Sequence, residues 1–391
     1  MDIGSQPPVL ELRKFVAPEF IFGNGARQLA VQYALNFGAR RVFLATDPGV
    51  IRAGWVVPLL RDLEQEGIGA TIYDEISPNP RDFEVMRGAE IFEKEHCNLI
   101  IAIGGGSPMD CAKGIGIVHT NKKHVLSFEG VDAIDIPGPP LICIPTTAGT
   151  AADVSQFSII NDIQRKVKIA LISKKLVPDA ALIDPYVTTT MDPYLTACTG
   201  MDALTHAVEA YCSNANSPIT DVHALQAISL IPRFLLAATR HPDDLTARGQ
   251  MMLASLHAGL AFSNTSLGAV HAMAHSLGGF LGLPHGECNA LLLEHVVAKN
   301  FDAVPERYFK IAETLGCYDP SDPYETKRNR LIEGLADFRR QVGITKSLGQ
   351  LGVRIEDIPQ LAGKAIKDPC MATNPCFLSQ AEVEAIYAAA L

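Results

Sequence analysis

The first half of the chain alternates short apolar runs with amphipathic segments. Apolar runs at 41–47, 70–74, 98–103 and 141–145 predict buried strands, and the spacing of apolar residues over 83–95 predicts a helix. Strands that alternate with helices are typical of a doubly wound α/β domain with a parallel sheet. Ligands of such a sheet bind at the carboxyl ends of its strands.

The pattern changes near residues 184–185. Beyond them the chain is rich in Ala and Leu and has a 3.6-residue apolar period, for example over 221–238 and 331–341. We therefore expect two domains, an α/β domain over residues 1–188 and an all-helical domain over residues 189–391. A cleft between the two is the expected place for a functional site.

The helical half carries two pairs of residues that commonly bind metals. Asp202 and His206 are four residues apart, as are His271 and His275, and this spacing places both members of a pair on one helix face. His285 follows a Gly-Leu-Pro turn and can fold back toward them. A lone His on an apolar face is more often a core residue than a ligand. Three of the eleven histidines fall in one short stretch without Lys or Arg, however, which favours a divalent-metal site.

A glycine-rich turn follows the predicted strand at 98–103. Residues 104–110 read Gly-Gly-Gly-Ser-Pro-Met-Asp, with Ser107 expected as the N-cap and Pro108 as the first residue of the next helix. Glycines let backbone amides approach a pyrophosphate, and a helix N-terminus favours negative charge. A glycine turn that only caps a helix is the alternative interpretation.

Two further strand ends carry polar residues. Asp47 can accept hydrogen bonds from ribose hydroxyls and repel a 2′-phosphate, which favours NAD over NADP, or it can cap the turn expected at Pro48 and Gly49. Residues 145–150 carry three threonines and a glycine. They can line a nucleotide's ribose and phosphate or form an ordinary polar turn.

Composition narrows the classes of protein to consider. With 48% hydrophobic and 19% charged residues, the 391-residue chain is expected to be globular. A net charge of −10 without a basic run argues against a nucleic-acid partner. Residues 1–8 lack the pattern of a secretory signal, and no apolar stretch reaches the roughly 18 residues of a membrane span. Nine scattered cysteines without a CxxC pair indicate the reducing cytoplasm, and Cys370 and Cys376, the nearest pair, are expected to be free thiols.

Five segments together resemble the iron-containing, metal-dependent alcohol dehydrogenases, in the family's order and along nearly the whole chain. They are GGGSPMDCAK (104–113), PTTAGTAADVS (145–155), LVPDAALIDP (176–185), LTACTGMDALTHAVEAY (195–211) and HAMAHSLGGFLGLPHG (271–286). The resemblance implies an N-terminal dinucleotide-binding domain and a C-terminal helical domain. It implies hydride transfer between NAD and an alcohol or aldehyde, with Fe²⁺ as the metal and Zn²⁺ as the alternative, in a homo-oligomer, a dimer or larger.

The resemblance also assigns site residues. It implies metal ligands at Asp202, His206, His271 and His285, and places His275 beside the nicotinamide as a proton relay or as a group that orients a ligand. Residues implied to contact the cofactor are Asp47, Asn79, Gly105, Gly106, Ser107, Thr146, Thr147, Thr150, Phe157, Lys168 and Val187. The chain departs from the family at Asp153, where many members have Glu, and at Cys376, where Arg is frequent.

The low charge around the ligand segments indicates a small neutral substrate, such as a short-chain alcohol, a diol or lactaldehyde. A polyol or glycerol dehydrogenase of the same superfamily is the nearest alternative. An NAD- and metal-dependent lyase is disfavoured, because it needs a basic cluster for a phosphate-bearing substrate and the ligand segments lack Lys and Arg. A binding module without catalysis is the third alternative.

Overall fold

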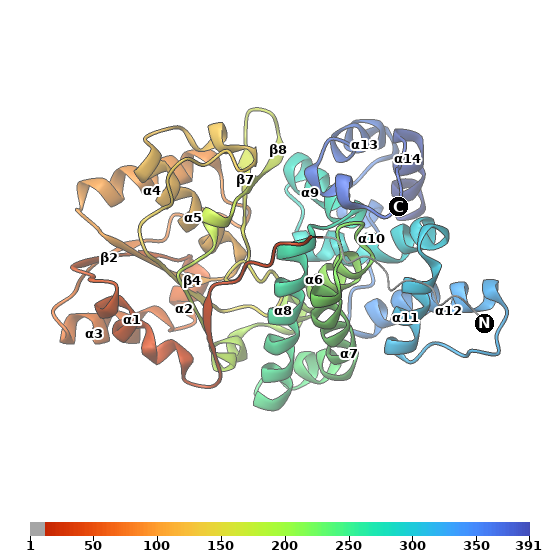
Figure 1. The fold of residues 1–391 in the computed structure, drawn as a ribbon, viewed down its shortest axis with the longest axis horizontal. Coiled ribbons are helices and arrows are strands. Elements are labelled where there is room, and N and C mark those ends of the chain that lie inside the picture. Colours follow the sequence, from red (N-terminus) through yellow and green to blue (C-terminus); the bar gives the residue numbers. More distant parts are fainter. Residues whose placement is uncertain (1–11) are drawn as a thin grey trace, which may run out of the picture.

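The computed structural model describes residues 12–391, which form an α/β half and a helical half that lie side by side (Figure 1). Residues 1–8, in which we expect no secretory signal, lie outside the described residues. The strand order of the main sheet is β1-β9-β6-β4-β2-β3, and every pair is parallel. The six strands are β1 (Glu19–Phe22), β2 (Arg41–Ala45), β3 (Gly69–Tyr73), β4 (Leu99–Gly104), β6 (Leu141–Pro145) and β9 (Ala180–Ile183).

Helices cover both faces of this sheet, as the predicted fold class requires. Alternate residues of β2 point to opposite faces, so that Phe43 packs in the core shared with α4 and α5, while Val42 packs in the core shared with α1 and α3. The helices of this half are α1 (Ala30–Asn36), α2 (Pro48–Arg52), α3 (Val56–Gln65), α4 (Asp82–Lys94) and α5 (Gly106–Asn121). The prediction of a doubly wound parallel sheet is confirmed.

An antiparallel hairpin was not predicted. Strands β7 (Phe157–Asp162) and β8 (Val167–Ile172) pair with each other, and β5 (Gly130–Val131) adds to β8. The turn between β7 and β8 contains neither Gly nor Pro. Instead, the Asp162 carboxylate accepts hydrogen bonds from the amides of Gln164 and Arg165, and Lys166 adopts a left-handed conformation. A turn built in this way lacks the usual sequence markers of a hairpin.

Two local predictions were wrong. Helix α5 begins at Gly106 with Gly105 as its N-cap, two residues before the predicted start, so Ser107 is the second helical residue and not the cap. A Cβ on Gly106 would lie 2.7 Å from Thr150 Oγ1, and the lack of a side chain therefore lets the helix begin directly against the threonine loop. Pro48 and Gly49 open the short helix α2 and do not form an isolated turn.

The second half contains helices and, among its described residues, no strand. Its helices are α6 (Pro193–Cys212), α7 (Pro218–Arg240), α8 (Leu245–Thr265), α9 (Ala269–Leu281), α10 (His285–Asn300), α11 (Pro305–Leu315), α12 (Tyr324–Gln341), α13 (Ile358–Ala365) and α14 (Gln380–Ala389). The 3-10 helices of the chain are η1 (Ala26–Leu29), η2 (Val125–Phe128), η3 (Lys174–Leu176), η4 (Pro185–Thr190), η5 (Phe301–Ala303), η6 (Gly349–Leu351), η7 (Ile355–Asp357) and η8 (Pro369–Thr373). The predicted boundary after residue 188 falls within η4, and it stays a prediction.

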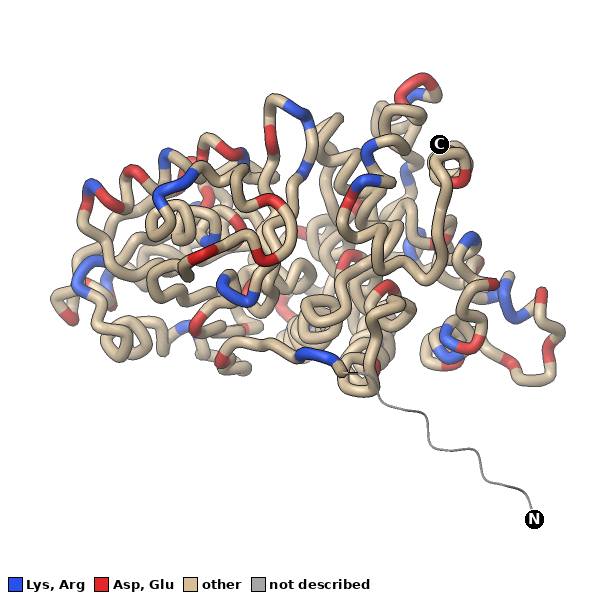
Figure 2. The backbone as a smooth tube through the Cα atoms, turned by 45° about the horizontal axis from the view of Figure 1, so that its top comes forward, with Lys and Arg blue, Asp and Glu red and all other residues tan. Residues whose placement is uncertain are grey.

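Helix α7 is the one described helix that is long and apolar enough to cross a membrane by length and composition alone. It packs against α6, α8 and α11, and a core helix of a helical domain passes the same test. Basic and acidic residues are interspersed along both halves in the view of Figure 2, without a continuous basic stripe.

Candidate metal and nucleotide site

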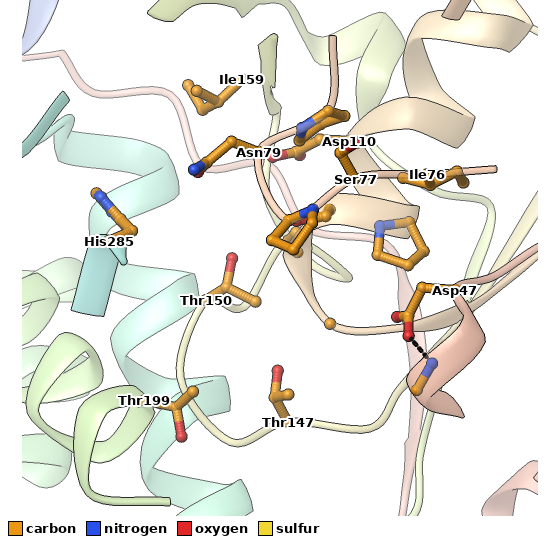
Figure 3. A pocket seen from close by; sticks show the side chains of 18 of the residues that line it. Asp47, Ile76, Ser77, Asn79, Asp110, Thr147, Thr150, Ile159, Thr199 and His285 are labelled. Carbon is orange, nitrogen blue, oxygen red and sulfur yellow. Dashed lines mark hydrogen bonds between the residues drawn. The ribbon is translucent and has the colours of Figure 1, made fainter. Parts of the chain in front are cut away.

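A cleft of about 1150 Å³ lies between the two halves. Its α/β wall is formed where three neighbouring strands end. Asp47 follows β2, Gly105 follows β4 and Thr146 follows β6, and these strands are adjacent in the sheet. In Figure 3, Asp47 lies at one end of the pocket and His285 at the other, with Thr147 and Thr150 between them. An elongated ligand can therefore extend from the sheet to the helical half.

The glycine turn and the threonine loop are in direct contact. A Cβ on Gly105 would lie 3.3 Å from the Thr147 side chain, in addition to the closer approach of Gly106 to Thr150. Ser107 lies in the first turn of α5 and lines the cleft. The backbone amides at the start of α5 and the threonine hydroxyls thus form one polar surface, which suits a pyrophosphate.

Asp47 caps the helix that follows it. Its Oδ1 accepts hydrogen bonds from the amides of Gly49 at 2.7 Å and Val50 at 3.1 Å. Its second carboxylate oxygen makes no hydrogen bond with a described residue, and the side chain lines the cleft. The cap is therefore real, and it leaves one oxygen for a ribose hydroxyl.

The remaining residues that we predicted to contact the cofactor divide into two groups. Asn79, with a φ of 108°, and Lys168 line the cleft, as does Phe157, whose ring lies 5.8 Å from that of Phe262. Val187 is fully buried and does not line the cleft. Its amide donates to the Asp184 carbonyl and its carbonyl accepts from Thr190, so its backbone groups are already paired inside η4.

The acid and histidines of the helical half meet at the other end of the cleft. Asp202, His271 and His285 each offer a donor atom within 4.8 Å of the others. The Nε2 atoms of His271 and His285 lie 3.6 Å and 3.8 Å from Asp202 Oδ1. His206 stacks face to face on His271, with ring centroids 4.5 Å apart, and its nitrogens lie outside that group of three.

Glu209, which the sequence analysis missed, holds His271 in place. Its Oε2 lies 2.6 Å from His271 Nδ1, and its Oε1 accepts a hydrogen bond from the Val270 amide. Because an ionised carboxylate only accepts, Nδ1 carries the hydrogen and Nε2 is the atom that remains for a metal. A buried acid three residues after His206, on the same helix, was the available sequence marker.

Asn289 was missed as well. It is fully buried on α10, four residues after His285. Its Nδ2 lies 2.6 Å from Asp202 Oδ1, 3.0 Å from His271 Nε2 and 3.2 Å from His285 Nε2. The amide nitrogen thus contacts three of the predicted ligands, and its shortest contact is the hydrogen bond to the Asp202 carboxylate.

The charges of this group suit a divalent cation. Burial alone would raise the pKa of Asp202, but His206, His285 and His271 outweigh it and hold that pKa well below its usual range. Burial lowers the pKa of His206 to about 3 and that of His285 far below its ordinary value. Burial also disfavours a charged His271, yet hydrogen bonds to Asp202 and Glu209 prevail and raise its pKa to about 9. His271 is therefore the one imidazole of the group that stays protonated beside the Asp202 carboxylate. A bound cation would replace that proton.

His275 lies beside the ligand group without belonging to it. Its ring stacks on His285 with centroids 5.3 Å apart, and its Nδ1 lies 2.9 Å from Asp368 Oδ2. This contact fixes the ring and leaves Nε2 as the free nitrogen of a residue that lines the cleft. Cys370 and Cys376 are free thiols, as expected, and Cys376 contacts Asn300 away from the cleft.

Comparison with known proteins places this geometry in a family. The profile described as "Iron-containing alcohol dehydrogenase" matches residues 17–185, and "Fe-containing alcohol dehydrogenase family, C-terminal" matches residues 196–391. The chain is 40% identical over 370 residues to a 1,3-propanediol dehydrogenase of Citrobacter freundii, covering 94% of this chain and 95% of the relative. It is 42% identical over 380 residues to alcohol dehydrogenase 4 of Schizosaccharomyces pombe, covering 96% and 89%. A crystal structure of 1,3-propanediol oxidoreductase superposes with a TM-score of 0.94 at 38% identity, covering 97% of this chain and all of the other.

Replacement of Asn289 by Leu should weaken metal binding. Loss of a group that holds metal ligands costs about 10–100-fold in affinity, and the apolar side chain cannot donate to Asp202. The measurement is a chelator competition on the metal-free protein. Asn300→Leu is the control, because Asn300 is equally buried on α10 but bonds to Asn374. Wild-type affinity in Asn289→Leu would show that the amide does not support the site.

Metal binding should release a proton near neutral pH. Because the pKa of His271 is raised to about 9, this residue is protonated below that pH and must lose its proton to ligate. Affinity should therefore rise with pH and level off above about 9. Zn²⁺ added to weakly buffered metal-free protein with an indicator dye measures the release. No release near neutral pH would contradict the assigned protonation.

Proposed function

We propose a function from the premise that the chain belongs to the iron-containing alcohol dehydrogenase family. It is an NAD-dependent oxidoreductase that acts on alcohols or aldehydes. The finer proposal is that it exchanges hydride between NAD and a small neutral alcohol or aldehyde, of the short-chain alcohol, diol or lactaldehyde type. The observation that carries this proposal is the single cleft that joins a nucleotide-binding strand edge to a buried carboxylate–imidazole group.

The metal ligands in this proposal are Asp202, His206, His271 and His285. When bound, the ion would act as a Lewis acid that polarises the substrate oxygen, and NAD would carry the hydride. Asp202, His271 and His285 are already grouped, and the His206 ring lies beside them, stacked on His271. The family favours Fe²⁺, while one carboxylate and three imidazoles also suit Zn²⁺.

The cofactor residues in this proposal lie along the sheet edge. The free oxygen of Asp47 receives the adenosine ribose and disfavours a 2′-phosphate, which makes NAD the preferred cofactor. The further residues that we assign to the cofactor are Asn79, Gly105, Gly106, Ser107, Thr146, Thr147, Thr150, Phe157 and Lys168. Val187 can act only by shaping η4, because it lies outside the cleft lining.

The walls near the ligand group support a neutral substrate. Phe262 stacks on His206 with centroids 4.3 Å apart, and Phe157 lies 5.8 Å from Phe262. Leu267 and Cys370 also line the cleft. Four Lys or Arg residues line the cleft. Arg52, Arg81 and Arg87 belong to α2, the turn before α4 and α4 itself, and only Lys168 lies on β8, beside α9. A phosphate-bearing substrate, as the lyase alternative requires, would find no basic cluster here.

His275 is the proposed proton relay. The Asp368 carboxylate holds Nδ1, so the ring presents its other nitrogen while stacked beside His285. Its alternative role is to orient the His285 ring. We further propose a domain boundary after residue 188, a homo-oligomer, a dimer or larger, and a cytoplasmic location, all three from the resemblance and the composition of the chain.

Anaerobic oxidation of NADH tests the function. The protein is stripped of metal and reloaded separately with Fe²⁺ or Zn²⁺, and neutral short-chain aldehydes, hydroxyaldehydes and glyceraldehyde are offered with NADH or NADPH. We expect iron-dependent loss of NADH absorbance, fastest with an uncharged short aldehyde. Absence of turnover with either metal, despite measured NAD binding, would contradict the proposed hydride transfer.

Replacement of His275 by Ala should lower turnover by about 10²–10⁴-fold, the usual contribution of a positioned acid–base group. Metal content should remain that of the wild type, because His275 lies outside the ligand group. His223→Ala, on α7 and not part of the cleft lining, is the matched control. If the His275 variant loses its metal instead, the residue supports the ligands and the relay role is wrong.

A further inference from the structure

A second set of metal-binding side chains lies in the wall of the cleft. His275 comes from α9, and Asp368 and Cys370 come from the start of η8. One ring nitrogen of His275, an Asp368 carboxylate oxygen and Cys370 Sγ all lie within 4.8 Å of one another. His275 and Cys370 line the cleft, so a small ion can reach them from that side.

The fold holds these three side chains in place. Asp368 Oδ1 accepts a hydrogen bond from the Cys370 amide at 2.8 Å, and Oδ2 lies 2.9 Å from His275 Nδ1. The exposed fraction is 7% for the His275 side chain and 8% for the Asp368 side chain, and Cys370 is 2% exposed. A cation would therefore meet preformed donors and would not have to order a loop.

The thiol distinguishes this set from an ordinary histidine–carboxylate pair. A carboxylate on Nδ1 is the usual way to orient an imidazole, and it needs no cysteine. Cys198 also lines the cleft, but among the described residues only Cys370 has both an imidazole and a carboxylate at ligand distance. One nitrogen, one oxygen and one sulfur donor form a set that suits zinc.

The charges of the Asp368 carboxylate and the Cys370 thiolate allow an ion at this second site while another ion occupies the site at Asp202. The His275 ring lies 5.3 Å from that of His285 and 6.1 Å from that of His271, so two uncompensated cations would repel strongly. A divalent ion bound by the Asp368 carboxylate and the Cys370 thiolate has no net charge. It therefore adds little repulsion to a metal held by Asp202 and the histidines.

We propose that His275, Asp368 and Cys370 form a second metal site, which binds a divalent cation such as Zn²⁺ and inhibits the enzyme. The fourth coordination position of the ion is open to the cleft. Bonds form from the ion to Nδ1, the carboxylate oxygen and Sγ; the thiol proton leaves to solvent, and the hydrogen of the neutral imidazole moves from Nδ1 to Nε2. No redox change is involved. An ion on His275 removes the relay, so turnover stops while the first metal stays bound. The inhibition rests on the proposed function, whereas the site itself does not.

Cobalt spectroscopy tests the site independently of activity. Metal-free protein receives Co²⁺ in steps, and a thiolate-to-cobalt charge-transfer band in the near ultraviolet reports a bond to sulfur. We expect no such band with the first equivalent and a clear band with the second. Cys370→Ser, or Cys370→Ala if the serine variant misfolds, should lose the band, while Cys198→Ser should keep it. A band that survives without Cys370, or no band at two equivalents, would overturn the proposal.

Zinc inhibition of the iron-loaded enzyme tests the consequence. We expect half-inhibition to require at least about tenfold more Zn²⁺ in Cys370→Ser than in wild type, since even loss of a supporting group costs 10–100-fold in affinity. Metal analysis of the inhibited wild type should find one iron and one zinc per chain. Iron replaced by zinc, with equal inhibition of both proteins, would refute a second inhibitory site. If neither protein turns over, the proposed function fails, and the cobalt band alone decides the site.

Discussion

The hydrogen bond between Glu209 and His271 is the interaction on which the chemistry of this protein depends. Removing an acid and an imidazole from water is costly unless each meets a partner, and here the two meet at 2.6 Å inside the helical half. The contact fixes which nitrogen of His271 faces the cleft. It also ties α6, which carries Asp202 and Glu209, to α9, which carries His271. A rigid ligand group results, built on helices and not on loops.

The second requirement is that this group lies opposite a nucleotide surface. Strands β2, β4 and β6 are adjacent, so the turns after them share one edge of the sheet, and the helical half covers that edge across the cleft. The α/β half supplies amides, hydroxyls and one carboxylate, whereas the helical half supplies imidazoles. Hydride transfer needs the nucleotide-binding groups and the metal-binding groups to meet at one substrate. Neither half alone would therefore provide the site.

The sequence predicted the sheet and the helical half, and every residue proposed for the site except Val187 lines the cleft, because most of these patterns are local. Buried strands, the Gly-Gly-Gly turn and four-residue spacing on helices can each be recognised within a short window. Glu209 was missed because its partner His271 lies 62 residues away, Asn289 because its shortest contact, to Asp202, spans 87 residues, and Asp368 because its partner His275 lies 93 residues away. The β7–β8 hairpin was missed because a side chain, Asp162, replaces the usual turn residues. The start of α5 depends on contact with Thr150 from a different strand end.

The most direct test of the account is a crystal structure of the protein loaded anaerobically with Fe²⁺ and NAD, with anomalous scattering measured at the iron edge. The account predicts one iron peak at about 2.0–2.2 Å from donors of Asp202, His206, His271 and His285, with the nicotinamide beside His275. An iron peak elsewhere, or a nicotinamide far from these histidines, would contradict it.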